Sequence, residues 1–151
     1  MRKVITLFVA AGCLLALLWS GCKGPDEMEI DPVPYITIEN VNPTSLIEFQ
    51  EDVIIEVKYE DQDGDLGFPN PDSLSLEVWD SRLSQPDLYH LQPLVPTDTS
   101  LHIQGIVEVV VPSPFLLGNG NSEKVNYSIR IRDRAGNWSN SVVTRDITIT
   151  E

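Results

Sequence analysis

The chain has 151 residues, 42% of them hydrophobic, and its 23 acidic residues outnumber the 10 basic ones, which gives a formal net charge of −13 at pH 7. This length suits one domain with a sizeable core and leaves no room for a second. The acidic balance argues against nucleic acid as a partner, because phosphates require a clustered positive face and the basic residues here are scattered. Divalent cations are the partners that this charge favours.

The first 21 residues predict a secretory signal peptide. Arg2 and Lys3 give a positive start, and residues 4–19 form an apolar run. This run is shorter than the roughly 20 apolar residues of a comfortable membrane span, but it suits the core of a signal peptide. It closes on "LLWSGC", in which two small residues precede Cys22.

The "LLWSGC" segment resembles the lipobox of bacterial lipoproteins, although Trp19 stands where Leu is commonest. The resemblance implies that residues 1–21 are removed and that Cys22 carries a covalent diacylglycerol and a fatty acyl group such as palmitate. Two alternatives stay open. Cleavage before Cys13 would leave the apolar segment "LLALLWSG" exposed, and an uncleaved segment would act as a membrane anchor.

Residues 22–34 predict an extended, solvated tether behind the lipidated cysteine, because they contain three prolines and four acids. An acidic stretch directly after the cysteine resembles the export signal of surface-exposed lipoproteins in Bacteroidota-type cells. That resemblance implies the outer face of the outer membrane, and a spacer on a periplasm-facing lipoprotein is the alternative. Loss of Arg2 and Lys3 takes the net charge from −13 to −15. An anionic membrane surface would repel such an acidic domain, so the lipid is expected to anchor the protein.

From Tyr35 onward the apolar residues recur with a period of two, and turn residues interrupt them regularly, which predicts strands. The predicted strands cover residues 35–41, 53–60, 73–79, 88–95, 103–111, 125–132 and 142–149. We therefore expect one all-β domain over residues 35–151, an antiparallel immunoglobulin-like β-sandwich of about seven strands. The alternation turns Trp79 outward, whereas an immunoglobulin-like fold would bury a tryptophan on its third strand.

The segment "YSIRIRDRAGNWSNSVVT" resembles the closing hairpin of bacterial immunoglobulin-like and cadherin-like modules, which often end in Tyr-x-Ile-x-Ile-x-Asp-x-x-Gly-Asn-x-Ser. Together with "DQDGDLG", it makes residues 35–151 similar to the single-domain lipoproteins of unassigned function that are common in the Bacteroidota. The resemblance implies a β-sandwich in an extracytoplasmic setting. It leaves the ligand and the partner open.

Asp61, Asp63 and Asp65 occupy alternate positions in "YEDQDGDLG" and are the best candidate metal ligands. Calcium takes about six to eight oxygen ligands and tolerates irregular geometry. The loop is not an EF-hand, because Leu66 stands where that motif has glycine and the prolines that follow prevent an exit helix. The remaining interpretation is a calcium loop between two strands, of the cadherin-like kind.

In a sandwich of alternating strands, the loop after the second strand and the loop after the sixth emerge at the same end. The latter carries Asp133 and Asn137, so we expect these two residues to join Asp61, Asp63 and Asp65 around one calcium ion. The alternative is a polar turn, in which aspartate caps backbone amides. Three aspartates this close exceed what a turn requires, and their repulsion is unfavourable without a cation.

Other side chains give weaker signals for chemistry. His90 and His102 fall in or beside strand-like segments, and the sequence has no nucleophile elbow or phosphate-binding glycine loop. Trp138, at the tip of the last hairpin, is a candidate contact for a sugar or a protein partner, or else packs over its own hairpin. We expect a non-enzymatic, lipid-anchored envelope module for protein binding or assembly. A surface glycan-binding module is the alternative.

Overall fold

The computed structural model describes residues 30–97 and 100–151. The predicted signal peptide, Cys13, Cys22 and most of the predicted tether therefore lie outside the described residues. The described chain forms ten strands: β1 (Tyr35–Asn42), β2 (Ser45–Ile47), β3 (Val53–Asp61), β4 (Leu74–Asp80), β5 (Asp87–His90), β6 (Ile103–Val111), β7 (Ser122–Val125), β8 (Tyr127–Ile131), β9 (Val142–Val143) and β10 (Ile147–Thr150). No helix suited in length and hydropathy to crossing a membrane occurs in this part of the chain.

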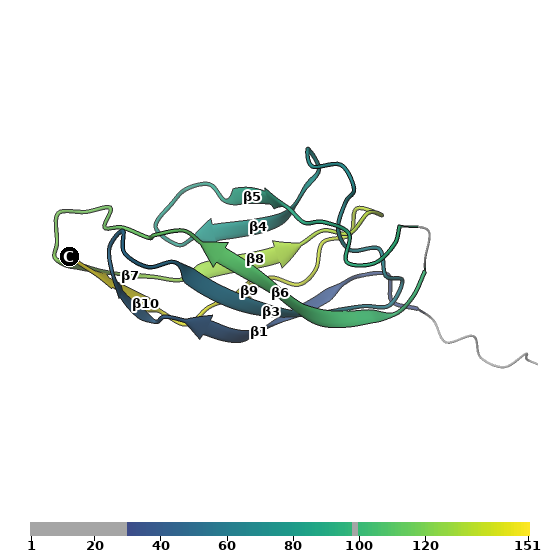
Figure 1. Ribbon diagram of the computed structural model, residues 1–151, viewed down its shortest axis with the longest axis horizontal. Coiled ribbons are helices and arrows are strands. Elements are labelled where there is room, and N and C mark those ends of the chain that lie inside the picture. Colours follow the sequence, from purple (N-terminus) through teal and green to yellow (C-terminus); the bar gives the residue numbers. More distant parts are fainter. Residues whose placement is uncertain (1–29, 98–99) are drawn as a thin grey trace, which may run out of the picture.

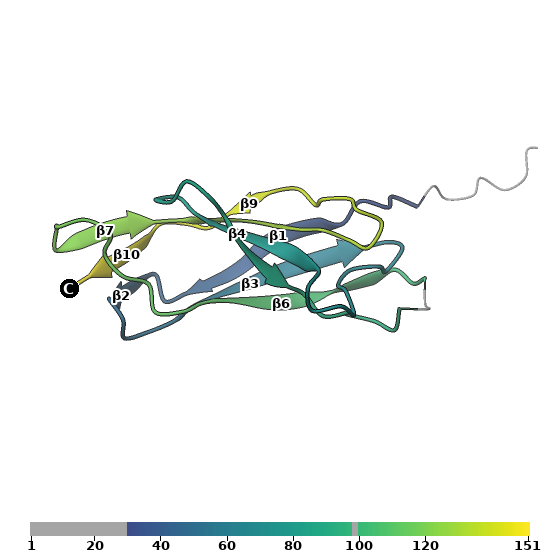
Figure 2. The same cartoon turned by 90° about the horizontal axis from the view of Figure 1, so that it is seen from above.

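The strands form a β-sandwich (Figures 1 and 2). One layer is the sheet β1-β3-β6, and the other is the sheet β5-β4-β8-β9. A small sheet, β2-β10-β7, prolongs the second layer, because only Asn126 separates β7 from β8. All strand pairs are antiparallel except β2 with β10, which is parallel.

Alternation of apolar and polar residues explains why the layers pack. In β3, Val53, Ile55 and Val57 are fully buried, whereas Lys58 faces solvent. Residues of the same kind from all three sheets complete one hydrophobic cluster, including Ile36, Leu46, Leu76, Val78, Ile129, Ile131, Ile147 and Ile149. Burial of this apolar surface is the main favourable contribution to folding.

The structure confirms the all-β sandwich, and each predicted segment overlaps a strand, but the segment at 142–149 is two strands, β9 and β10, in different sheets. The details differ where the pattern is short or interrupted. Strand β2 was not predicted, since three residues carry no readable period. The segment at 88–95 pairs only as far as His90, and Pro93 beyond it has no N–H to donate to a neighbouring strand. Trp79 is 41% exposed, as the alternation predicts. The immunoglobulin-like classification stays a prediction.

The two ends of the sandwich are distinct in Figure 1. At the stem end, defined here as the end where the described chain begins at Ile30, the loop after β3 lies beside the loop after β8. At the opposite, C-terminal end, Glu48 donates its backbone N–H to Thr150, and Glu151 donates to Asn121. The aspartate loop therefore belongs to the end of the domain where the described chain begins.

Candidate cation site at the stem end

The backbone of the aspartate loop is fixed by two glycines. Gly64 and Gly67 have φ angles of 71° and 82°, in the left-handed region that side chains rarely adopt. A Cβ on Gly64 would collide with the carbonyl of Leu101, and one on Gly67 would collide with the carbonyl of Gln92. Between them Leu66 is fully buried in the core. This residue anchors the loop to the core.

Three carboxylates converge within this loop. One oxygen each from Asp61, Asp63 and Asp65 lies within 4.8 Å of the others. Asp61 Oδ2 accepts hydrogen bonds from the backbone amides of Asp65 (2.9 Å) and Leu66 (3.1 Å). Asp65 Oδ2 accepts one from the amide of Ala135 at 2.9 Å. These bonds fix the orientation of two of the three carboxylates.

Three other oxygens of the cluster lack a hydrogen-bond partner in the described part of the chain. The Oδ1 atoms of Asp61, Asp63 and Asp65 are buried and have no hydrogen-bond partner among the described residues. Asp61 as a whole is only 1% exposed. Buried polar atoms are nearly always satisfied in proteins, and an unsatisfied one needs an explanation such as a bound ion.

The loop after β8 encloses the cluster from the other side. Asp133 and Leu66 form an isolated antiparallel bridge. The guanidinium of Arg134 donates to the backbone carbonyl of Gly67 at 2.9 Å, and lies 3.4 Å from those of Leu66 and Gly64. These carbonyl oxygens are thereby occupied by an internal cation and are not free ligands.

Asp133 and Asn137 lie beside the cluster but are bonded to each other. The backbone amide of Asn137 donates to Asp133 Oδ1 at 2.7 Å, and its side-chain amide donates to Oδ2 at 2.8 Å. The same side-chain amide lies 3.2 Å from the carbonyl oxygen of Pro32. Of the five predicted ligands, three therefore converge with free oxygens, while the fully buried Asp133 contributes its charge from outside.

Burial and neighbouring negative charges raise the pKa values of two carboxyl groups of the cluster. Burial, followed by a hydrogen bond and the charge of Asp61 and the charge of Asp133, raises the pKa of Asp63 from 3.8 to about 6. Burial and the charges of Asp133 and Asp63 also raise the pKa of Asp65. The amide of Ala135 and the charge of Arg134 oppose this second shift. A single arginine does not offset four carboxylates.

The arrangement is chemically suited to a hard divalent cation. Carboxylate oxygens are the ligands of calcium, magnesium and manganese, whereas imidazole and thiolate favour zinc and copper. The described residues supply no histidine or cysteine to this cluster. Magnesium demands near-ideal octahedral geometry, while calcium accepts an irregular set completed by water. Calcium therefore fits this donor set best.

The other candidate residues lie away from the cluster. Trp138 is half-buried, and the guanidinium carbons of Arg130 and Arg132 lie 4.3 Å and 5.5 Å from its ring centroid. His90 Nε2 lies 2.7 Å from the carbonyl oxygen of Phe68. His102 is half-exposed and lies 3.1 Å from Glu60.

Arg134 is the residue of this site that the sequence analysis does not single out. Its only signal is a basic residue directly after Asp133, in the loop predicted to face the aspartates.

Comparison of the chain with protein-family models, with curated proteins and with solved structures gives no match in any of the three.

Proposed function

We propose that this protein is a non-enzymatic, lipid-anchored module of the bacterial cell envelope that serves in protein binding or assembly and binds calcium at its stem end. The observation that carries the calcium site is the convergence of three buried carboxylate oxygens, from Asp61, Asp63 and Asp65, that lack hydrogen-bond partners. The lipid anchor rests on the lipobox-like segment that ends at Cys22.

A cation removes two unfavourable contributions at once. Burying a charged oxygen without a hydrogen-bond partner destabilises the folded state by about 1–3 kcal/mol or more per group. Like charges within 4.8 Å also repel one another. Calcium would satisfy the three free oxygens and neutralise the repulsion, while Asp61 Oδ2 and Asp65 Oδ2 keep their backbone donors.

The position of the site gives calcium a mechanical role. Gln62, between two of the proposed ligands, accepts a hydrogen bond from the backbone amide of Asp31 at 3.0 Å. Asn137, which holds Asp133, also contacts the carbonyl of Pro32. A cation that rigidifies both loops would therefore fix the direction in which the domain leaves its tether. An oriented domain suits binding or assembly at the outer surface of the outer membrane.

A glycan-binding module is the second candidate, and the structure offers it less support. Arg130 covers the ring of Trp138, and it also donates two hydrogen bonds to Glu77, of 2.7 and 2.9 Å. The indole N–H of Trp79 donates to the carbonyl of Leu83. Two arginines already lie against the ring of Trp138, and the indole N–H of Trp79 is already used, so protein binding remains the favoured function.

Calorimetric titration of the purified full chain with calcium tests the site directly. We expect one ion per chain, and no binding to an Asp61→Asn variant. This substitution keeps an oxygen for the amides of Asp65 and Leu66, but it replaces the free oxygen with an NH2 group. Asp72→Asn, an exposed aspartate outside the cluster, is the matched control and should bind normally. A chain that takes up no calcium contradicts the proposal.

A further inference from the structure

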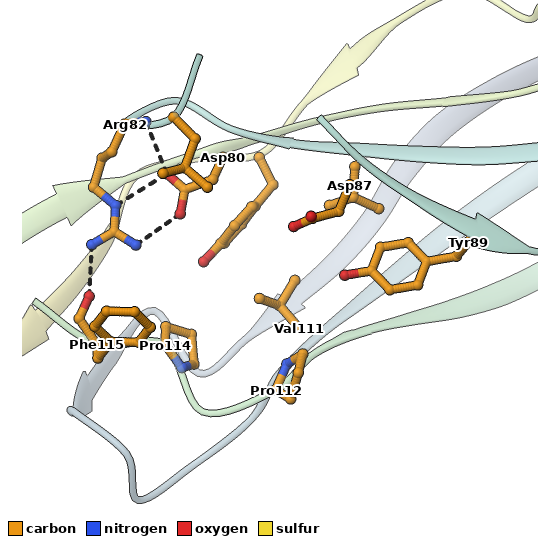
Figure 3. A pocket seen from close by; sticks show the side chains of 11 residues that line it. Asp80, Arg82, Asp87, Tyr89, Val111, Pro112, Pro114 and Phe115 are labelled. Carbon is orange, nitrogen blue, oxygen red and sulfur yellow. Dashed lines mark hydrogen bonds and ion pairs between the residues drawn. The ribbon is translucent and has the colours of Figure 1, made fainter. Parts of the chain in front are cut away.

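A second site lies toward the C-terminal end of the sandwich. A cavity of about 170 Å³ opens where β5 and the end of β6 form the edges of their sheets. Figure 3 shows the side chains that line it. The walls are mostly apolar, from Val111, Pro112, Pro114 and Phe115. The cavity lies between the edges of the two layers, and none of its lining residues belongs to the aspartate loop.

One charged group of the cavity is already used by the protein. Arg82 donates to Asp80 from Nε at 3.0 Å and from Nη2 at 2.7 Å. Its Nη1 donates to the carbonyl of Phe115 at 2.8 Å and to Glu123 at 2.9 Å. Arg82 thus holds the loop after β6 in place and has little capacity left for a ligand.

Acceptor groups remain free. Tyr127 is only 2% exposed and lines the cavity, and no described residue bonds to its hydroxyl or to the carboxylate of Asp87. Burial and the charge of Asp80 raise the pKa of Tyr127 to about 12. Burial and the charge of Asp87 raise the pKa of Tyr89. Both hydroxyls are therefore neutral at physiological pH, and the cavity carries net negative charge.

An exposed aromatic pair borders the cavity. Phe49 stacks on Phe115 with ring centroids 5.3 Å apart and planes 9° apart, and the two residues are 64% and 45% exposed. Phe49 has a φ of 60°, which costs a non-glycine residue about 1–2 kcal/mol. The turn is held by its amide, which donates to Pro114 at 3.2 Å, and by Glu48, which accepts from Leu116 at 3.1 Å. Strain that keeps aromatic rings in solvent is typical of a binding surface.

We propose that this surface binds a polypeptide partner through a lysine or arginine side chain flanked by an apolar residue. The cationic group would donate to Asp87 and to the tyrosine hydroxyls, while its alkyl stem packs along Val111 and the prolines. The apolar neighbour would cover Phe49 and Phe115. The net negative charge of the chain, −15 once residues 1–21 are removed, would steer such a partner toward the domain. The proposal rests on the proposed protein-binding function and does not depend on calcium.

Short peptides test the chemistry. The isotope-labelled full chain in detergent would be titrated with acetyl-Gly-Lys-Leu-Gly-amide, with the same peptide carrying acetyl-lysine, and with cellohexaose. We expect the lysine peptide alone to shift the resonances of Tyr89, Tyr127 and Phe115. We expect its affinity to fall about tenfold in Asp87→Asn and in Phe115→Ala. The exposed Asp72→Asn variant should behave as the unmodified chain.

Equal binding of the acetyl-lysine peptide would overturn the proposal, because that peptide keeps the stem and lacks the charge. A response to cellohexaose at the same resonances would instead make the surface a glycan site. The absence of any response to the lysine peptide would also overturn the proposal. A chain that binds calcium but not the peptide contradicts this surface alone, so the two proposals fail separately.

Discussion

Arg134 Nη1 lies 2.9 Å from the carbonyl oxygen of Gly67 and thereby joins the loop after β8 to the loop after β3. The charge of the same guanidinium partly offsets the rise in the pKa of Asp65 that burial and the neighbouring carboxylates cause. Arg134 thus connects the two loops and also acts as a counter-ion of the carboxylate cluster. It holds the loop in a shape that presents three free oxygens together.

Replacement of Arg134 by alanine should destabilise the metal-free protein by about 1–3 kcal/mol, because backbone carbonyls lose a charged donor and the carboxylates lose a counter-ion. Calcium should reduce this loss of stability, since it supplies the missing positive charge. Chemical denaturation in EGTA and in calcium measures both effects. Lys124→Ala is the control, because this side chain is 70% exposed and pairs with Asp146 only at 3.6 Å. Equal losses for the two variants would contradict the role of Arg134.

The pH dependence of the metal-free protein should follow Asp63. Its pKa of about 6 exceeds the ordinary value of 3.8, so between these pH values the folded state binds more protons than the unfolded state. The free energy of unfolding contributed by this group therefore falls as the pH rises through that window. Thermal unfolding in calcium-free buffer should show a midpoint that falls across this range. The fall should be smaller in Asp63→Asn, and an identical fall in that variant would assign the effect to other groups.

Two glycine substitutions separate backbone strain from steric collision. Gly136 has a φ of 99°, but nothing lies within 4 Å of a Cβ placed there. Gly136→Ala should therefore cost only the strain, about 1–2 kcal/mol. Gly67→Ala should cost clearly more, because its Cβ would also meet the backbone at Gln92. Denaturant unfolding of the two variants measures the difference, and equal losses would contradict the packing described for the aspartate loop.

The two cysteines allow a direct test of the lipid anchor. Cys22→Ala should abolish incorporation of radiolabelled palmitate and release the protein from the membrane fraction. Cys13→Ala should leave both unchanged, because this residue lies inside the predicted signal peptide. The reverse result would identify Cys13 as the lipidated residue. Membrane retention of both variants without label would favour an uncleaved anchor.

Much of the fold could be predicted because burial imposes a simple period. Val53, Ile55 and Val57 alternate with exposed residues, and all three are buried in β3. The same reasoning predicted that the loop at 61–67 lies at one end with the loop after β8. Strand β2 gave no such signal, because its pairing with β10 depends on the tertiary fold and not on its three residues.

The detailed geometry of the site could not be predicted. Residue types alone do not distinguish Asp133, which is bonded on both oxygens by Asn137, from Asp61, which keeps one oxygen free. The counter-ion role of Arg134 and the stacking of Phe49 on Phe115 likewise depend on loop conformation. Side-chain partners across loops are set by three-dimensional placement, which sequence periodicity does not encode.

Thermal unfolding of the full chain in excess EGTA and in millimolar calcium tests the calcium site most directly. A ligand at a hundredfold excess over its Kd stabilises the folded state by about 2.7 kcal/mol, which should raise the midpoint by several degrees. We expect this rise for the unmodified chain and for Asp72→Asn, and we expect its loss in Asp63→Ala. Superimposed curves for the unmodified chain in EGTA and calcium would show that residues 61–67 form a polar turn and not a metal site.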